Sequence, residues 1–211
     1  MALFHAARIV PSKDELIADW APRQAWGPAP GSPITTIGAF RFDDPAGKVG
    51  LETFLVSAED HILQIPLTYR EAPLGGADDA LIGTMEHSAL GQRWVYDGLR
   101  DPCFVLMLAA VTMTGQGEAL GMAEYDGRWY IAPSNVRIQG GGWSTERVPV
   151  DGFVSADPSA PDVTFTDDQL ELTFHRRPQP GPRPPIGLTA TWIDHPAPVV
   201  LAAVARFADP N

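Results

Sequence analysis

The chain has 211 residues, 45% of them hydrophobic and 19% charged, which is typical of one globular domain or of two closely packed halves. No stretch approaches the roughly 18 consecutive apolar residues of a membrane span. The formal net charge of -11 repels nucleic-acid phosphates and anionic lipids, so we expect neither nucleic acid nor a membrane as a partner.

The first ten residues contain no export signal, because His5 and Arg8 interrupt any apolar run. The single cysteine, Cys103, cannot form an internal disulfide, and its apolar neighbours favour a buried thiol over a nucleophile. Both observations predict a cytoplasmic protein.

The first half of the chain predicts one sheet with two helices. Ser12 and Glu15 form a capping-box pattern that predicts a short helix ending near Trp20. The prolines within 21–33 predict an extended loop, from which Trp26 packs back on the core. Strands are expected at 34–42, 49–57, 61–69, 80–88 and 92–96, the first three as an antiparallel meander.

Two prolines in this half carry positional information. Pro66 lies inside the third predicted strand and favours an edge position or a bulge there. Asp101 and Pro102 form a helix start, with Asp101 as the N-cap. The run 103–113 that follows is apolar on nearly every face, so this helix should be buried against the sheet.

The second half predicts strands at 119–125, 128–131, 135–139, 148–154, 163–166, 169–176, 188–193 and 199–207. An Asp126-Gly127 turn joins the first two as a hairpin. We therefore divide the chain into 1–117 and a β-rich half, 118–211, with the alternative that both pack as one unit. The proline-rich segment 176–185 predicts a solvated loop, in which Arg176, Arg177 and Arg183 face water rather than form a binding patch.

Motifs for chemistry are weak. The five histidines have no metal-ligand spacing, no phosphate-binding glycine motif is present, and we expect neither a metal nor a cofactor. Glu86 and His87 are neighbours on a predicted strand and point to opposite faces, so they do not form an acid/base pair. Asp43 and Asp44 are explained by a turn.

Several long stretches resemble the maltokinase N-terminal cap-like family: FRFDDPAGKVGLE at 40–52, PLTYR at 66–70, LIGTMEHS at 81–88 and RWVYDG at 93–98. The resemblance implies an α+β fold in which a curved antiparallel sheet with few helices, similar to a cystatin fold, is followed by the β-rich half. In the kinases that it resembles, the cap precedes the catalytic lobe. After Gly117 this sequence has no catalytic-loop Asp and Asn and no strand Lys for phosphates, so phosphate transfer by the chain alone is not expected.

The resemblance also implies a role in α-glucan, maltose or trehalose metabolism. The leading hypothesis is a non-enzymatic accessory, binding or regulatory protein, whose partner is an enzyme of that metabolism or a small sugar. One alternative is a small enzyme acting on a sugar or sugar phosphate through an Arg/Glu/His set. Another is a structural oligomerisation module, and the oligomeric state is left open.

The polar positions within the matching stretches are the candidates for ligand binding, and no residue is assigned as catalytic. They could line one end of the sheet, or they could form buried ion pairs, such as Arg93 or Arg70 with Glu86 or Asp97. The candidates are Arg41, Asp43, Thr68, Arg70, Glu86, His87, Arg93, Tyr96 and Asp97.

Overall fold

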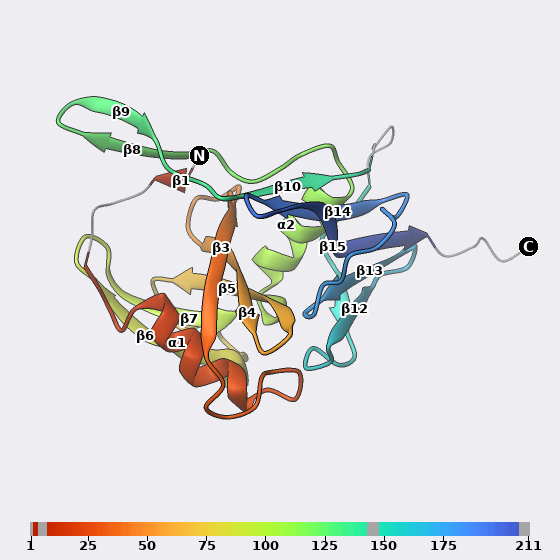
Figure 1. Ribbon diagram of the computed structural model, residues 1–211, viewed down its shortest axis with the longest axis horizontal. Helices are drawn as coiled ribbons and strands as arrows, with labels where there is room; N and C mark the ends of the chain where they lie inside the picture. The colour runs from red at the N-terminus through yellow and green to blue at the C-terminus, as the bar shows by residue number, and fades with distance from the viewer. Residues whose placement is uncertain (1, 4–7, 143–147, 207–211) are drawn as a thin grey trace, which may run out of the picture.

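The computed structural model describes residues 2–3, 8–142 and 148–206 (Figure 1). In this part of the chain the fold is mostly β, with the helices α1 (Lys13–Trp20) and α2 (Pro102–Thr112). A curled antiparallel half-barrel forms the N-terminal part, and a second antiparallel sheet forms the C-terminal part. The predicted fold, a curved sheet with few helices followed by a β-rich half, is confirmed. No described helix is long and apolar enough to cross a membrane.

The N-terminal sheet has six antiparallel strands in the order β2-β6-β7-β5-β4-β3. The predicted meander and the two strands after it are confirmed, each within two residues of its expected ends. The strands are β2 (Ile9–Val10), β3 (Ile34–Phe42), β4 (Gly50–Ala58), β5 (His61–Arg70), β6 (Leu81–His87) and β7 (Gly91–Asp97).

The edge position predicted for Pro66 is confirmed locally, because at residue 66 β5 has a ladder partner on one side only, and there is no bulge. Pro66 pairs in regular register with Thr53 of β4, while the ladder to β7 begins only at Leu67. Residues two apart on a strand point their backbone N–H groups to the same side, so Gln64 shows what lies beside the Pro66 nitrogen. The Gln64 N–H donates to the Arg176 carbonyl at 2.8 Å. Proline is tolerated because no ladder needs a donor from this side of residue 66.

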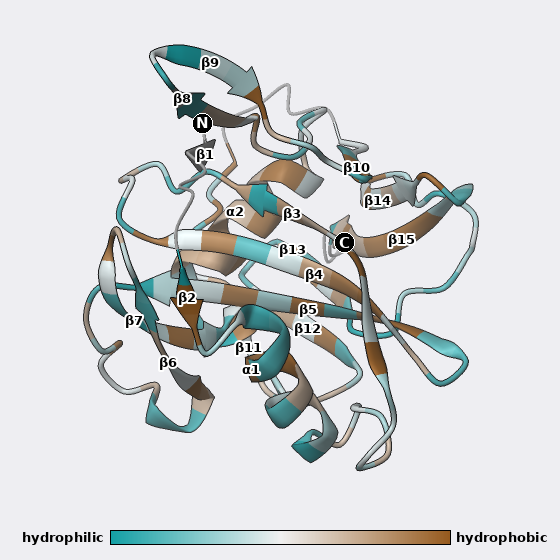
Figure 2. Ribbon diagram, turned by 60° about the vertical axis from the view of Figure 1, so that its left-hand side comes forward, coloured by the Kyte–Doolittle hydropathy of each residue, from teal (hydrophilic) through white to brown (hydrophobic). Residues whose placement is uncertain are grey.

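Helix α1 covers one face of this sheet, which we call the α1 face (Figure 2). Its predicted capping box is confirmed: the Ser12 hydroxyl accepts from the Glu15 N–H at 3.2 Å, and the Glu15 carboxylate accepts from the Ser12 N–H at 2.7 Å. Trp26 packs back on this face as predicted, 2% exposed and with its ring centroid 5.5 Å from that of Trp20. The loop between α1 and β3 includes the 3-10 turn η1 (Ala21–Arg23).

Helix α2 lies between the two large sheets. It begins as predicted, with the Asp101 carboxylate accepting from the Cys103 N–H at 3.0 Å. Phe104 and Leu108 are buried in a cluster that also contains Leu51 of the first sheet and Leu172 of the second. Short 3-10 turns precede β6 and α2, η2 (Asp78–Ala80) and η3 (Gly98–Arg100).

The C-terminal sheet has the strand order β10-β14-β15-β13-β12-β11. Its strands are β10 (Val136–Gly140), β11 (Val154–Ser155), β12 (Asp162–Thr166), β13 (Leu170–His175), β14 (Gly187–Trp192) and β15 (His195–Arg206). The strand expected at 148–154 was wrong except at its end, because Val150 and Phe153 pack on the core from a loop. The expected strand 199–207 is confirmed to Arg206, and its last residue lies outside the described residues.

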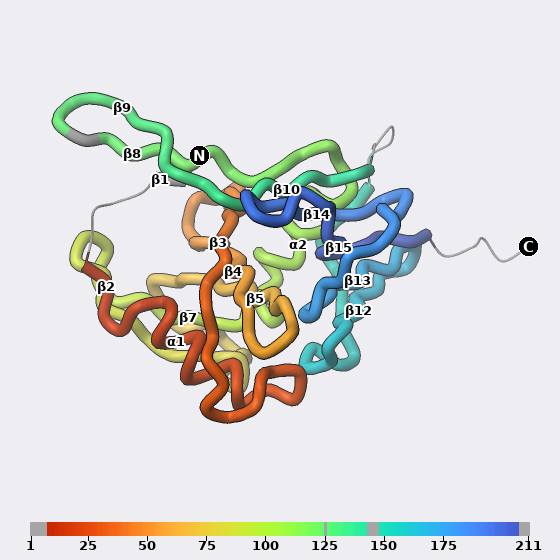
Figure 3. Tube along the Cα trace, viewed as in Figure 1, coloured from red at the N-terminus to blue at the C-terminus, as the bar shows by residue number. Residues whose placement is uncertain are grey.

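A small third sheet, β1-β8-β9, projects from the body of the molecule (Figure 3). Its strands are β1 (Ala2–Leu3), β8 (Gly121–Tyr125) and β9 (Arg128–Ile131). The predicted Asp126-Gly127 hairpin is confirmed, with φ of 50° and 70° at the two turn residues.

The proline-rich segment contains a correction. Arg176 is buried rather than solvated: it pairs with Asp97, and its guanidinium carbon lies 4.4 Å from the Trp26 ring centroid. Arg177 donates to the Trp26 carbonyl at 2.9 Å. These contacts, together with the core shared through α2, join the two sheets, while the division at 117/118 stays a prediction.

Candidate functional site

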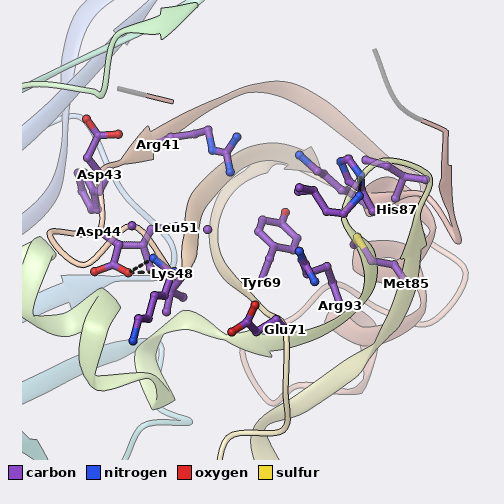
Figure 4. A pocket seen from close by; sticks show the side chains of 17 residues that line it. Arg41, Asp43, Asp44, Lys48, Leu51, Tyr69, Glu71, Met85, His87 and Arg93 are labelled. Atoms are coloured by element: carbon purple, nitrogen blue, oxygen red, sulfur yellow. Dashed lines mark hydrogen bonds between the residues drawn. The ribbon is translucent and has the colours of Figure 1, made fainter. Parts of the chain in front are cut away.

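A pocket of about 590 Å³ opens on the α1 face of the N-terminal sheet, at the start of α1 (Figure 4). All six strands of the sheet contribute to its wall. The polar and charged residues of the wall are Lys13, Arg41, Asp43, Asp44, Lys48, Tyr69, Glu71, His87 and Arg93.

Strand register brings the central side chains to one face. Tyr69 of β5 lies opposite Gly50 on one side and Val95 on the other, and Arg93 follows on the same face two residues before Val95. A Cβ on Gly50 would lie 3.0 Å from the Tyr69 ring and 3.2 Å from the Arg41 guanidinium. Glycine therefore leaves room for both side chains in the pocket.

Beneath the pocket lies a buried carboxylate with two partners. Glu52, 5% exposed, accepts from the Lys13 ammonium at 2.5 Å and from the Tyr69 hydroxyl at 2.7 Å. Burial and the neighbouring Glu52 charge raise the pKa of Tyr69 well above its ordinary value, so the phenol stays protonated. Lys13 offsets the charge of Glu52, and this pair contributes no net charge to the pocket floor.

The β3–β4 turn forms one end of the pocket and is built on Asp44. Its carboxylate accepts from the backbone N–H groups of Ala46, Lys48 and Val49 at 2.8–2.9 Å. Partial burial would raise the pKa of Asp44, but these N–H groups and the Cys103 thiol outweigh it and lower the pKa. The turn explanation of Asp44 is thus confirmed.

Cys103 lies behind this turn. Burial, followed by the charge of Asp44, raises the pKa of its thiol to about 12. It is therefore a thiol at neutral pH, as the prediction of an inert cysteine requires.

The two ends of the pocket differ in chemistry. Figure 4 shows Arg41, Arg93, His87 and Glu71 around Tyr69, while Asp43 and Lys48 lie with Asp44 at the other end. At the first end the guanidinium groups of Arg41 and Arg93 offer cationic N–H donors, which bind anions. The second offers carboxylate acceptors, which suit hydroxyl groups.

Four of the nine predicted site residues line this pocket: Arg41, Asp43, His87 and Arg93. The structure brings these four together from strands β3, β6 and β7 and the turn after β3. Glu86 does not join them, because it is exposed on β6 and points away from His87. The Arg/Glu/His set of the enzymatic alternative is therefore not assembled here.

The other predicted residues have structural partners. Arg70 pairs with Asp101, with both N–O distances 2.7 Å, rather than with Glu86 or Asp97. That pair raises the pKa of Arg70 and ties β5 to the start of α2.

Thr68, Tyr96 and Asp97 are buried. The Tyr96 hydroxyl accepts from the Leu74 N–H at 2.9 Å, and Asp97 pairs with Arg176 at the far end of β7. Buried ion pairing was thus the right explanation for Arg70 and Asp97, with different partners from those proposed.

Sequence reasoning missed Lys13, Lys48, Tyr69 and Glu71. Strand alternation was a usable signal for Tyr69: it lies between Thr68 and Arg70, so only one face of β5 could belong to the pocket. The two lysines carry a second signal, because they are the only lysines of the chain and both line this pocket.

The described residues contain no group of three or more His, Cys, Asp or Glu side chains placed to hold a metal ion.

The segment that builds most of the pocket matches a known family. Residues 20–101 match the maltokinase N-terminal cap domain. This cap segment runs from the end of α1 through β3–β7 to the N-cap of α2, and the rest of the chain is unassigned. A search of curated proteins found no match to the chain.

Proposed function

We propose that this protein is a non-enzymatic accessory or regulatory protein that binds a small sugar ligand in the pocket of its cap segment. The observation that carries the proposal is the pocket itself, where carboxylates at one end and N–H donors at the other flank Tyr69. Its volume of about 590 Å³ falls within the roughly 300–1,000 Å³ of typical small-molecule sites.

The cap match supports a place for this protein in α-glucan, maltose or trehalose metabolism. In this proposal an enzyme of that metabolism is the protein partner, and ligand occupancy of the pocket regulates the contact. The proposal needs no reaction in the pocket and no cofactor.

Thermal-shift measurements and calorimetry with maltose, trehalose and glucosamine test whether the protein binds a sugar. A ligand at 100 times its Kd stabilises the folded state by about 2.7 kcal/mol, which a melting curve resolves. The Arg41→Gln variant should lose the shift, and Arg137→Gln, whose side chain is 77% exposed and outside the pocket, should keep it. The proposal would be refuted if no sugar gave a thermal shift or a heat of binding and no enzyme of the pathway were captured from the native host.

One feature favours the oligomerisation alternative as a second candidate. Trp129, Tyr130 and Ile131 are exposed on β9, and β9 is an edge strand of its sheet. Antiparallel pairing of β9 with the same strand of a second copy would satisfy its open backbone groups. Sedimentation velocity checks this: a dimer that Ile131→Lys dissociates supports the candidate, and a monomer at high concentration excludes it.

A further inference from the structure

We propose that the ligand of this pocket carries a phosphomonoester, bound between Arg41 and Arg93 beside His87. This inference rests on the proposed function, in which the pocket binds a small sugar. It further specifies that this sugar is an anion, because it carries a phosphate group.

The distribution of charge is the first argument. The chain has 26 acidic and 15 basic residues, so an average patch of its surface is net negative. The pocket wall departs from this average: apart from Lys13, whose charge Glu52 offsets, it has the three cations Arg41, Lys48 and Arg93 against the three carboxylates of Asp43, Asp44 and Glu71. Cations concentrated in a concave site of an acidic protein attract an anion to that site.

The engagement of the carboxylates is the second argument. Three backbone N–H groups hold the charge of Asp44 in its turn, and Lys13 offsets Glu52 below the floor. Glu71 is exposed, so water screens its charge. Asp43 lies at the other end from Arg93 (Figure 4). The end around Tyr69 therefore has two guanidinium groups against one exposed carboxylate, that of Glu71.

The geometry of the donors is the third argument. Arg41 comes from β3 and Arg93 from β7, and they reach the Tyr69 region from different sides (Figure 4). Guanidinium forks from two directions match the several oxygens of a tetrahedral phosphate better than the two coplanar oxygens of a carboxylate. The sugar hydroxyls would then face Asp43.

Calorimetry with four probes tests this inference: glucose 6-phosphate, glucose, glucuronate and inorganic phosphate. We expect glucose 6-phosphate to bind at least tenfold tighter than glucose, and Arg93→Gln to weaken it at least tenfold. Arg93 also donates to the adjacent Gln92 carbonyl at the surface, so its replacement should leave the fold intact. Arg23→Gln, an exposed arginine outside the pocket, is the matched control and should bind as the parent does.

The outcomes separate this inference from the proposed function. Equal affinity for glucose and glucose 6-phosphate, unchanged in Arg93→Gln, would overturn the phosphomonoester and leave a neutral-sugar site. Glucuronate binding as tightly as glucose 6-phosphate would overturn the choice of phosphate over carboxylate. Inorganic phosphate bound in an Arg93-dependent way, with no sugar bound, would support the anion site and overturn sugar binding.

Discussion

Replacing Asp97 with asparagine should destabilise the protein severely. The Arg176 side chain is 0% exposed, and its Nε and Nη1 atoms have no hydrogen-bond partner among the described residues. Asp97 supplies the compensating charge, while the Pro158 carbonyl accepts only a longer bond of 3.3 Å from Nη2. The amide oxygen of the introduced asparagine could still accept from the Leu99 N–H, as Asp97 does at 3.2 Å, so the change removes mainly the charge.

The expected magnitude follows from burial. Removing one partner of a buried ion pair costs about 3–5 kcal/mol, because the other charge stays buried and uncompensated. For a chain of this size that loss lowers Tm by roughly 6–20 °C. The same loss is a large part of the roughly 5–15 kcal/mol that stabilises a typical folded protein.

Urea denaturation followed by tryptophan fluorescence measures the effect, since Arg176 lies over the Trp26 ring. The control is Asp79→Asn, which breaks an Arg100 pair at a carboxylate whose side chain is 66% exposed and should cost at most about 1 kcal/mol. A loss below about 1 kcal/mol in Asp97→Asn would refute the reasoning. In the double variant Asp97→Asn/Arg176→Met, much of the loss should be recovered, because no buried charge remains.

Three further predictions concern other parts of the fold. At pH 8 the Cys103 thiol, with its pKa raised to about 12, should react with a disulfide reagent at least about tenfold more slowly than in the urea-unfolded chain, because fewer thiolates outweigh the greater nucleophilicity of each. Asp44→Asn should speed the reaction, and a thiol that reacts as fast in the folded as in the unfolded chain would contradict this prediction. The contribution of Cys103 to stability is present below its ordinary pKa of 9.0 and should be lost as pH rises toward 12. Ser12→Ala should cost about 1 kcal/mol in urea denaturation, because it removes half of the capping box with Glu15, and an unchanged midpoint would contradict it. Gly140→Ala should give little soluble folded protein, because its Cβ would lie 2.0 Å from a backbone oxygen of α2; a parental melting curve would exclude this.

Local chemistry made several elements of both halves predictable. The capping box at Ser12, the Asp101-Pro102 helix start and the Asp126-Gly127 hairpin depend on residues a few positions apart, and all three form as expected. Segments rich in β-branched and aromatic residues, bounded by turn formers, likewise predicted the five long strands of the N-terminal sheet. A different signal, the resemblance to a cap domain, pointed to four of the residues that line the pocket.

Contacts between distant segments were beyond such reasoning. The local pattern of Pro66 indicated an edge position, but it does not show that the Arg176 carbonyl, 110 positions later, accepts a hydrogen bond on that open side of β5. Arg176 itself lies in a proline-rich context that is typical of solvated loops, yet Asp97 and Trp26 bury it.

The sequence by itself determined both helices and most of the strands, where they cap and turn, and that the protein is acidic with only two lysines. Only the tertiary structure decided that both lysines reach one pocket, that Tyr69 rather than its two neighbours faces it, and that Asp97 pairs with Arg176. The physical reason is range: capping and alternation are set within a few residues, whereas pairing and burial depend on which distant side chains the sheets and α2 bring together.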